Sequence, residues 1–236
     1  MTCKDPASPG AAWAGPTPTR MREIHAALQT LYPGVRSRLL EPSRGSPLNV
    51  LIATILSQST NDTLSSKAFA GLRKAFSDWQ GVLEADPALV EEVLAVGGLQ
   101  REKTRKIRAA LGKIRRDFGH ITLDPLFDWP PEKTYDYLVS LPGVGPKTAA
   151  CVIGFGLGKP AFPVDTHVLR ISKRLGLLPP KASAEKAQKA LEKVIPPDIK
   201  MPLHVMMIQH GQRVCLSRNP RCQDCPLKDT CVPRAG

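Results

Sequence analysis

The stretch LPGVGPKTAA, residues 141–150, places two prolines, two glycines and one lysine at the junction of two helix-like segments. A tight turn alone needs one glycine or one proline, so the surplus indicates a second role for this turn. Gly143 and Gly145 lack a Cβ, so the chain can turn sharply there and its backbone can come close to another molecule. Pro146 suits the first position of a second helix, whose free N–H groups and dipole attract an anion such as a nucleic-acid phosphate. A helix–turn–helix corner without a ligand is the alternative.

Helical periodicity dominates the rest of the chain, and strand signals are nearly absent. MREIHAALQTLY, residues 21–32, repeats apolar side chains at the i, i+3, i+4, i+7 spacing of an amphipathic helix. SPLNVLIATILSQS, residues 46–59, opens with Ser46 as an N-cap and Pro47 at the first helical position, and its nearly continuous apolar content predicts a buried helix. Short linkers rich in Gly and Pro separate the segments, as expected for an all-α protein.

Charge points to the class of partner. The sequence has 33 Lys and Arg residues against 21 Asp and Glu, a formal net charge of +12, which predicts a polyanionic partner such as nucleic acid. An acidic membrane surface is the alternative, but no apolar run approaches the roughly 20 residues of a spanning helix. Residues 1–20 repeat proline and lack the apolar core of a secretory signal, so we expect a disordered tail and a cytoplasmic, nucleoid-associated location.

The densest basic segment is REKTRKIRAALGKIRRD, residues 101–117. Two interpretations remain open for it: a solvated helix face, or a face that follows the phosphates of a nucleic acid.

Two motifs together carry a family resemblance. LPGVGPKTAA looks like a helix–hairpin–helix motif, and with FPVDTHVLRISKRLGL, residues 162–177, it resembles the DNA glycosylases of the endonuclease III family. The resemblance runs from SPLNVLIATILSQSTND, which starts at residue 46, to RCQDCPLKDTC, which ends at residue 231. It implies a two-lobed all-α fold with a groove between a six-helix lobe, residues 44–159, and a cluster lobe, residues 21–43 plus 160–236.

The same resemblance implies an activity and two catalytic residues. The enzyme would be a bifunctional DNA glycosylase/AP lyase that removes oxidised pyrimidines from duplex DNA and cleaves the abasic site by β-elimination. Lys147 would be the nucleophile, whose amine attacks the sugar C1′ and forms a Schiff base. Asp165 would be the carboxylate that stabilises positive charge developing on the sugar. An Asp directly before a helix is also a typical N-cap, and both roles can coexist. We expect a structural role for His167.

Four of the six cysteines, Cys215, Cys222, Cys225 and Cys231, are spaced C-x6-C-x2-C-x5-C. Such a set could form one tetrahedral S4 site, but zinc ribbons usually have two C-x2-C pairs and only one occurs here. Two disulfides are disfavoured in a cytosolic protein. The spacing matches the [4Fe–4S] cluster of the resembled family, which implies a structural cluster that shapes the loop LSRNPR, residues 216–221.

The resemblance also suggests which residues contact DNA. The family fills the gap left by a flipped nucleotide with a glutamine and an apolar wedge; the wedge position matches Leu99. The glutamine position holds Ser59, and Gln58 falls one residue earlier, about 100° round if the backbone there is helical. Where the family often has a basic residue, this chain has Asn219. The remaining expected DNA contacts are Gly143, Gly145, Thr148, Arg218 and Arg221.

Two other functions stay open from the sequence. Adenine-mismatch glycosylases share the fold and the cluster but lack the nucleophilic lysine and usually carry a C-terminal recognition domain. A non-catalytic DNA-binding or damage-sensing protein could use the same scaffold, although Lys147 together with Asp165 argues against it. We expect a monomer that acts on double-stranded DNA containing damaged bases or abasic sites.

Overall fold

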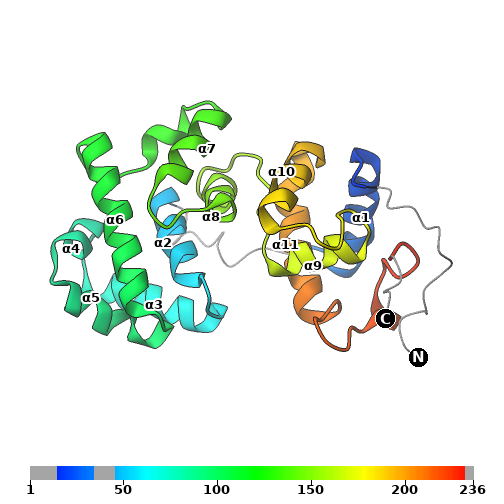
Figure 1. The fold of residues 1–236 in the computed structure, drawn as a ribbon, viewed down its shortest axis with the longest axis horizontal. Coiled ribbons are helices and arrows are strands. Elements are labelled where there is room, and N and C mark those ends of the chain that lie inside the picture. Colours follow the sequence, from blue (N-terminus) through cyan, green and yellow to red (C-terminus); the bar gives the residue numbers. More distant parts are fainter. Residues whose placement is uncertain (1–14, 35–45, 232–236) are drawn as a thin grey trace. The chain divides into compact units, whose positions relative to one another are not determined.

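The computed structural model describes residues 15–34 and 46–231, and every regular element in these ranges is helical (Figure 1). The prediction of an all-α protein is therefore confirmed. The chain folds into two compact units, which meet in sequence between Lys159 and Pro160. Each unit is described by itself below. No helix in the described ranges combines the length and apolar character needed to cross a bilayer.

The first unit, described over residues 46–159, has seven α-helices and three short helical segments in its described part (Figure 1). They are α2 (Pro47–Ser57), α3 (Asp62–Ala75), α4 (Trp79–Glu84), α5 (Pro87–Leu94), η3 (Ala95–Gly97), α6 (Gln100–Phe118), η4 (Asp124–Phe127), α7 (Pro131–Ser140), α8 (Pro146–Cys151) and η5 (Val152–Gly156). The last of these is a π-helical continuation of α8.

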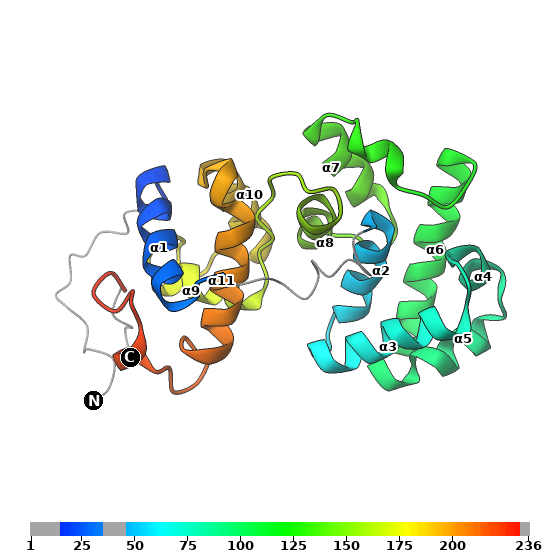
Figure 2. The same cartoon turned by 180° about the vertical axis from the view of Figure 1, so that it is seen from behind.

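α2 forms the centre of this unit. Nine of its eleven residues are buried, as its continuous apolar sequence predicts, and Pro47 occupies its first turn after Ser46. The helix packs against α3, α6, α8 and η5, and both views show it among the first three (Figures 1 and 2). A Cβ on Gly156 would stand 2.6 Å from the Cα of Pro47, so a glycine is needed where η5 meets α2. This contact anchors α8 from its C-terminal side.

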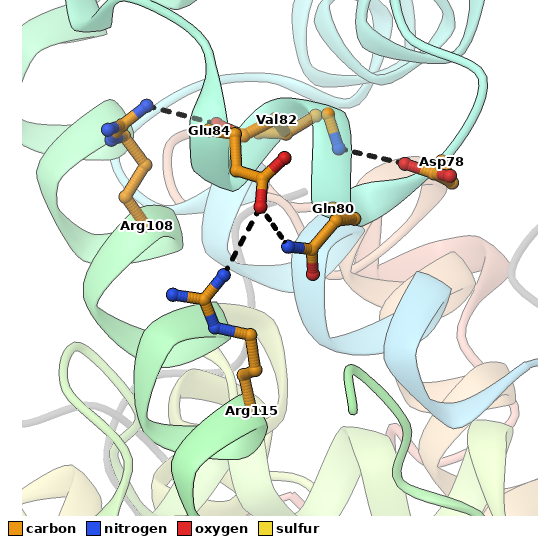
Figure 3. A network of polar contacts seen from close by, with 7 residues as sticks. Asp78, Gln80, Val82, Glu84, Arg108 and Arg115 are labelled. Atoms are coloured by element: carbon orange, nitrogen blue, oxygen red, sulfur yellow. Dashed lines mark hydrogen bonds and ion pairs between the residues drawn. The ribbon is translucent and has the colours of Figure 1, made fainter. Parts of the chain in front are cut away.

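The basic helix α6 is held against α4 by its own cations (Figure 3). Arg108 donates to the carbonyl of Val82 at 3.1 Å, and Arg115 forms an ion pair with Glu84 at 3.4 Å. The N-cap of α4 is Asp78, whose carboxylate accepts from the N–H of Gly81 at 2.8 Å. These two arginines therefore have structural partners within the unit.

Most of the remaining cations of residues 101–117 are also engaged. The pairs are Arg101–Glu91 at 3.6 Å, Lys106–Glu102 at 2.6 Å and Lys113–Asp117 at 2.8 Å. Lys103 is buried, whereas Arg105 and Arg116 are exposed. Because most of its cations already have partners within the unit, the structure favours the interpretation of this segment as a solvated helix face over a face that follows phosphates.

The second unit is described over residues 15–34 and 160–231. Its elements are α1 (Pro18–Leu31), α9 (Thr166–Arg174), α10 (Ala184–Val194), η6 (Pro197–Ile199), α11 (Lys200–Arg213) and η7 (Cys222–Asp224). α11 packs against both α9 and α1. Their shared core includes Met21, Leu28, Phe162, Val168 and Leu203, all fully buried.

The predicted tail at residues 1–20 needs a correction. Residues 1–14 lie outside the described part, but α1 begins at Pro18, inside the predicted tail. Thr17 is its N-cap, accepting from the N–H of Arg20 at 3.2 Å, and the guanidinium of Arg20 donates to the carbonyl of Leu175. The prolines of this stretch suggested disorder, yet a proline after a threonine is also a favourable helix start.

Candidate active site and nucleic-acid interface

The hairpin between α7 and α8 turns within residues 141–145. Val144 donates its N–H to the carbonyl of Leu141 at 3.1 Å, and both of these side chains are buried. Gly143 and Gly145 are exposed, and Pro146 is the first residue of α8 as its sequence predicts. The two apolar residues thus anchor the turn while the two glycines face outward.

The two glycines are needed for different reasons. Gly143 has a φ of +79°, and a Cβ there would stand 2.8 Å from Cγ of Lys106. Gly145 has an ordinary φ of −98°, and a Cβ there would meet no atom within 4 Å. Gly143 is therefore required by the fold itself. Gly145 leaves open space above the backbone, as an approaching molecule would require.

Lys147 and Thr148 follow directly in the first turn of α8. The first intrahelical bond of this turn joins the N–H of Ala149 to the carbonyl of Gly145 at 3.0 Å, so the N–H groups of residues 147 and 148 precede the helical ladder. Lys147 is half-buried, and the Thr148 side chain is only 4% exposed. Because Thr148 is buried, the group that it offers to an approaching DNA strand is its main-chain N–H.

Leu99, the expected wedge, and Ser59, which stands at the glutamine position, both have left-handed backbones. Their φ angles are +53° and +55°, and the Leu99 side chain is 51% exposed. This conformation costs a residue with a Cβ about 1–2 kcal/mol. Strain of this kind persists only where the surrounding structure imposes it, and it gathers at functional sites. The exposed leucine is therefore held outward in a defined conformation.

Gln58 does not lie in a helical backbone, contrary to the assumption behind its predicted rotation from Ser59. It is the C-cap of α2, with φ −61° and ψ 127°. Its Nε2 donates to the carbonyl of Gly143 at 3.0 Å, and its Oε1 accepts from Nζ of Lys106 at 3.0 Å. Both ends of its amide are thus engaged inside the protein, so its expected role in contacting DNA receives no support from this geometry.

Lys103 is a functional candidate that the sequence reasoning missed. Its side chain is 3% exposed, and its Nζ donates to the carbonyl of Gly97 at 2.8 Å, in the turn that precedes Leu99. Burial lowers its pKa below the ordinary lysine value. The signal was its position on the apolar stripe of α6, four residues before the buried Ile107. The ammonium group thus secures the turn that presents Leu99.

In the second unit, Asp165 is the N-cap of α9. Its Oδ1 accepts from the N–H of Val168 at 2.7 Å, and the residue is half-buried. The extended segment before it is held by the buried Gln188, which donates to the carbonyl of Phe162 at 2.7 Å and accepts from the N–H of Val164 at 2.9 Å. The capping interpretation is therefore correct, and Oδ2 of the same carboxylate remains for another partner.

His167 follows in the same helix and packs closely against α11. Its Nδ1 lies 3.0 Å from Nη2 of Arg170. A Cβ on Gly211 would stand 2.7 Å from the His167 ring, so a glycine is needed at that contact. These contacts agree with a structural role for the histidine.

The C-terminal cysteines gather beside this core. Arg174 donates to Sγ of Cys215 at 3.0 Å, and Sγ of Cys231 donates to the carbonyl of Arg174 at 3.2 Å. Sγ of Cys225 lies 3.4 Å from Nε2 of His210, whose pKa burial lowers to about 4. Burial raises the pKa values of Cys225 and Cys231, and the charge of the neighbouring Cys215 acts in the same direction on both. Three thiols are therefore close enough to influence one another.

The four C-terminal cysteines are the candidate ligands of an iron–sulfur cluster. Within the described ranges no three His, Cys, Asp or Glu residues stand in a metal-binding arrangement as they are. Cys215, Cys225 and Cys231 nevertheless all pack on the same hydrophobic core, and all three carry reduced thiols. With Cys222 in the same C-terminal segment, the donor set fits a cysteine-ligated cluster, because such a cluster requires four thiolates.

The loop ahead of η7 exposes the two arginines expected at DNA. Arg218 and Arg221 are both exposed, and between them Asn219 adopts a left-handed φ of +47°. The N–H of Arg221 donates to the carbonyl of Val214 at 2.9 Å, which closes the loop on itself. The loop is therefore shaped by its backbone and leaves both guanidinium groups at the surface.

Comparison with known proteins decides the family. The HhH-GPD superfamily of base excision DNA repair proteins matches residues 52–197, more than half of the chain. The chain belongs to this superfamily. Within it, the sequence is 36% identical over 185 residues to endonuclease III of Thermotoga maritima, an alignment that spans 78% of this chain and 82% of that protein. The chain is therefore also a member of the endonuclease III family.

Solved structures of the same family agree. A non-covalent complex of endonuclease III with DNA matches with a TM-score of 0.77 at 31% identity, and a trapped covalent endonuclease III–DNA intermediate matches with 0.78 at 31%. Each match covers 91% of this chain and 95% of the other. These findings confirm the predicted family, the helix–hairpin–helix glycosylase fold, DNA as partner, and the class of a base excision enzyme with glycosylase and AP lyase activity.

Proposed function

We propose that this HhH-GPD protein removes oxidised pyrimidines from duplex DNA and cleaves the resulting abasic site, with Lys147 as the nucleophile. The observation that carries the proposal is the position of Lys147 in the first turn of α8, directly behind the open backbone of Gly145. A nucleotide whose phosphate is bound by the free N–H groups of this turn would lie beside the lysine amine.

The chemistry follows from an amine at that position. Nζ forms a bond to the sugar C1′ while the bond from C1′ to the damaged base breaks, and the base leaves with a proton. The C1′–O4′ bond then breaks, O4′ takes up a proton as the sugar ring opens, and C1′ and Nζ form an imine. This imine acidifies the C2′ proton. Loss of that proton breaks the C3′–O bond, so the phosphate on the 3′ side leaves and the strand is cut. Water then releases Lys147 from the sugar. One residue therefore supports both base removal and strand cleavage.

Asp165 is proposed to stabilise the positive charge that develops at the sugar as the base departs. Its N-cap bond uses Oδ1, which leaves Oδ2 free to act on the substrate. The cap fixes the orientation of the carboxylate, because the bond to Val168 N–H restricts its rotation. Capping and catalysis are thus compatible in one side chain.

For DNA binding we propose three groups of contacts. The hairpin amides and the exposed Arg218 and Arg221 would bind backbone phosphates, which position the duplex without reading its sequence. Leu99 would enter the stack when a nucleotide is flipped out, with the short Ser59 contributing less. An enzyme with this substrate would act in the cytoplasm at the nucleoid.

We further propose a [4Fe–4S] cluster on Cys215, Cys222, Cys225 and Cys231. When bound, it would hold the C-terminal loop in shape, since base excision transfers no electrons. Two observations support the cluster. The reduced thiols of Cys215, Cys225 and Cys231 pack on one hydrophobic core, and the four cysteines have the sequence spacing that the endonuclease III family uses. Anaerobically purified protein should contain about four irons per chain and absorb broadly in the visible range. Stoichiometric zinc without iron would contradict this part of the proposal.

Covalent trapping tests the nucleophile. With borohydride, the wild-type protein should form a stable adduct on abasic DNA and on thymine-glycol DNA, and Lys147→Ala should form none. Lys74→Ala, which changes an exposed lysine in the last turn of α3, is the matched control and should be trapped normally. An undiminished adduct from Lys147→Ala would refute the assignment. Excision of adenine opposite an oxidised guanine, with no action on thymine glycol, would favour the adenine-mismatch alternative.

A further inference from the structure

Three elements of the first unit meet at one side chain, that of Gln58. The residue ends α2, its Nε2 donates to the carbonyl of Gly143 in the hairpin at 3.0 Å, and its Oε1 accepts from Lys106 of α6 at 3.0 Å. Lys106 is itself paired with Glu102 at 2.6 Å, one turn earlier in the same helix. A carboxylate, an ammonium group, an amide and a main-chain carbonyl therefore form one chain of polar contacts.

The hairpin is shaped to accept this chain. A Cβ on residue 143 would come within 2.8 Å of Cγ of Lys106, which is too close. Only glycine therefore allows the hairpin to pack against the aliphatic part of the lysine side chain. The same glycine has a left-handed φ of +79°, which residues with a Cβ rarely adopt, and its carbonyl is the acceptor for Gln58. An ammonium donor polarises the amide it contacts, which strengthens the bond that the amide donates in turn. The contact therefore joins the hairpin firmly to α6.

The same geometry argues against Gln58 as the residue that fills the gap in DNA. To enter the base stack of DNA, Gln58 would have to break both hydrogen bonds of its side-chain amide. The ammonium of Lys106 and the carbonyl of Gly143 would then lose this partner. Ser59, the next residue, is exposed and has a left-handed backbone, so the loop already directs a different residue outward.

We propose that Gln58 is a positioning residue for the hairpin: it fixes the carbonyl of Gly143, four residues before Lys147, and so sets where α8 begins. The structural part of this inference stands on the free protein. The kinetic part rests on the proposed function, because it assumes that Lys147 acts on the sugar.

Hydrogen exchange of the DNA-free protein tests the structural part. Gln58→Met keeps the length of the side chain and removes both hydrogen bonds, and Gln58→Glu keeps the acceptor for Lys106 but cannot donate to Gly143. Both variants should speed exchange of the Val144 N–H about five-fold or more, as expected for the loss of a hydrogen bond. Gln80→Met, at a half-buried glutamine on α4 that contacts Glu84, is the matched control and should leave hairpin exchange unchanged. Unchanged exchange in both Gln58 variants would overturn the proposal.

Single-turnover kinetics on two substrates then separate positioning from gap filling. If Gln58 positions the hairpin, Gln58→Met should slow cleavage of abasic DNA and excision of thymine glycol by the same factor, since both use Lys147. If Gln58 fills the gap, excision of the base should fall far more than abasic cleavage, because flipping an intact nucleotide costs more. That unequal loss would overturn the proposal. Lys106→Met, which keeps the stem against Gly143, should show a smaller equal loss.

A wrong assignment of Lys147 and a wrong assignment of Gln58 would give different experimental results. If another residue is the nucleophile, Lys147→Ala will still be trapped by borohydride, while the exchange result for Gln58→Met will be unaffected. Should Gln58→Met fold poorly, Gln58→Glu provides the same exchange comparison, because it retains the contact with Lys106 and lacks only the donor.

Discussion

The contrast between the two hairpin glycines gives a sharp quantitative prediction. In Gly143→Ala, the left-handed φ of +79° costs about 1–2 kcal/mol. The new Cβ also meets Cγ, Cβ and Cδ of Lys106 at 2.8–3.0 Å, and overpacking of this kind typically costs about 1–3 kcal/mol. Because Cβ of Lys106 is fixed to its helix, rotation of the side chain cannot relieve the whole overlap. The free energy of unfolding should therefore fall by about 2–5 kcal/mol.

Gly145→Ala is the matched control. Its φ of −98° suits alanine, and the added Cβ meets no atom within 4 Å. Alanine is a poorer N-cap than glycine, but it also reduces the entropy of the unfolded chain, so the two effects oppose each other. We expect a change in the free energy of unfolding within about 1 kcal/mol. The methyl group would instead occupy the space that a phosphate needs, so affinity for abasic-site DNA should fall.

Urea unfolding followed by tryptophan fluorescence measures both variants. Two of the three tryptophans, Trp79 and Trp129, belong to the unit that contains the hairpin. A loss below about 1 kcal/mol in Gly143→Ala would show that the hairpin relaxes freely and would refute the reasoning. An equal loss in Gly145→Ala would refute it as well, since nothing surrounds that position.

Three further outcomes are expected. Asp165→Asn should keep the cap of α9 and the melting temperature but lose about 100-fold in turnover, whereas Asp165→Ala should also lose about 1 kcal/mol of stability; normal turnover in the Asn variant would leave only the capping role. Burial lowers the pKa of Lys103, so just below the ordinary lysine pKa of about 10.4 the unfolded chain binds more protons and stability rises with pH. Lys103→Met should remove that rise, seen in urea midpoints at about pH 8 and about pH 10; a rise equal to that of the wild type would contradict the assignment. Cys225→Ser should lower iron content and destabilise the C-terminal loop, because cluster and fold form together; full iron content would exclude Cys225 as a ligand.

Most of the helices could be predicted from residues that lie close together in the sequence. The apolar run after Ser46 predicted a buried helix, and Pro146 predicted where the second helix of the hairpin begins, because periodicity and capping depend on residues within a few positions of each other. The ambiguity of Asp165 was also visible, since the N-cap pattern is local. The start of α1 at Pro18 was misjudged because Thr-Pro occurs both in disordered stretches and at helix starts.

Local patterns of residues were enough to predict the helices, the hairpin, the order of chemical groups along the chain and the family they resemble. How those groups are used depends on contacts that form only on folding. Lys103 became buried, Gln58 became attached to the hairpin, the Thr148 side chain was enclosed, and most cations of α6 found partners on their own or neighbouring helices. Each of these outcomes depends on a contact between residues that the chain brings together only on folding. The energy of a buried or paired polar group is set by that contact, and local sequence does not contain it.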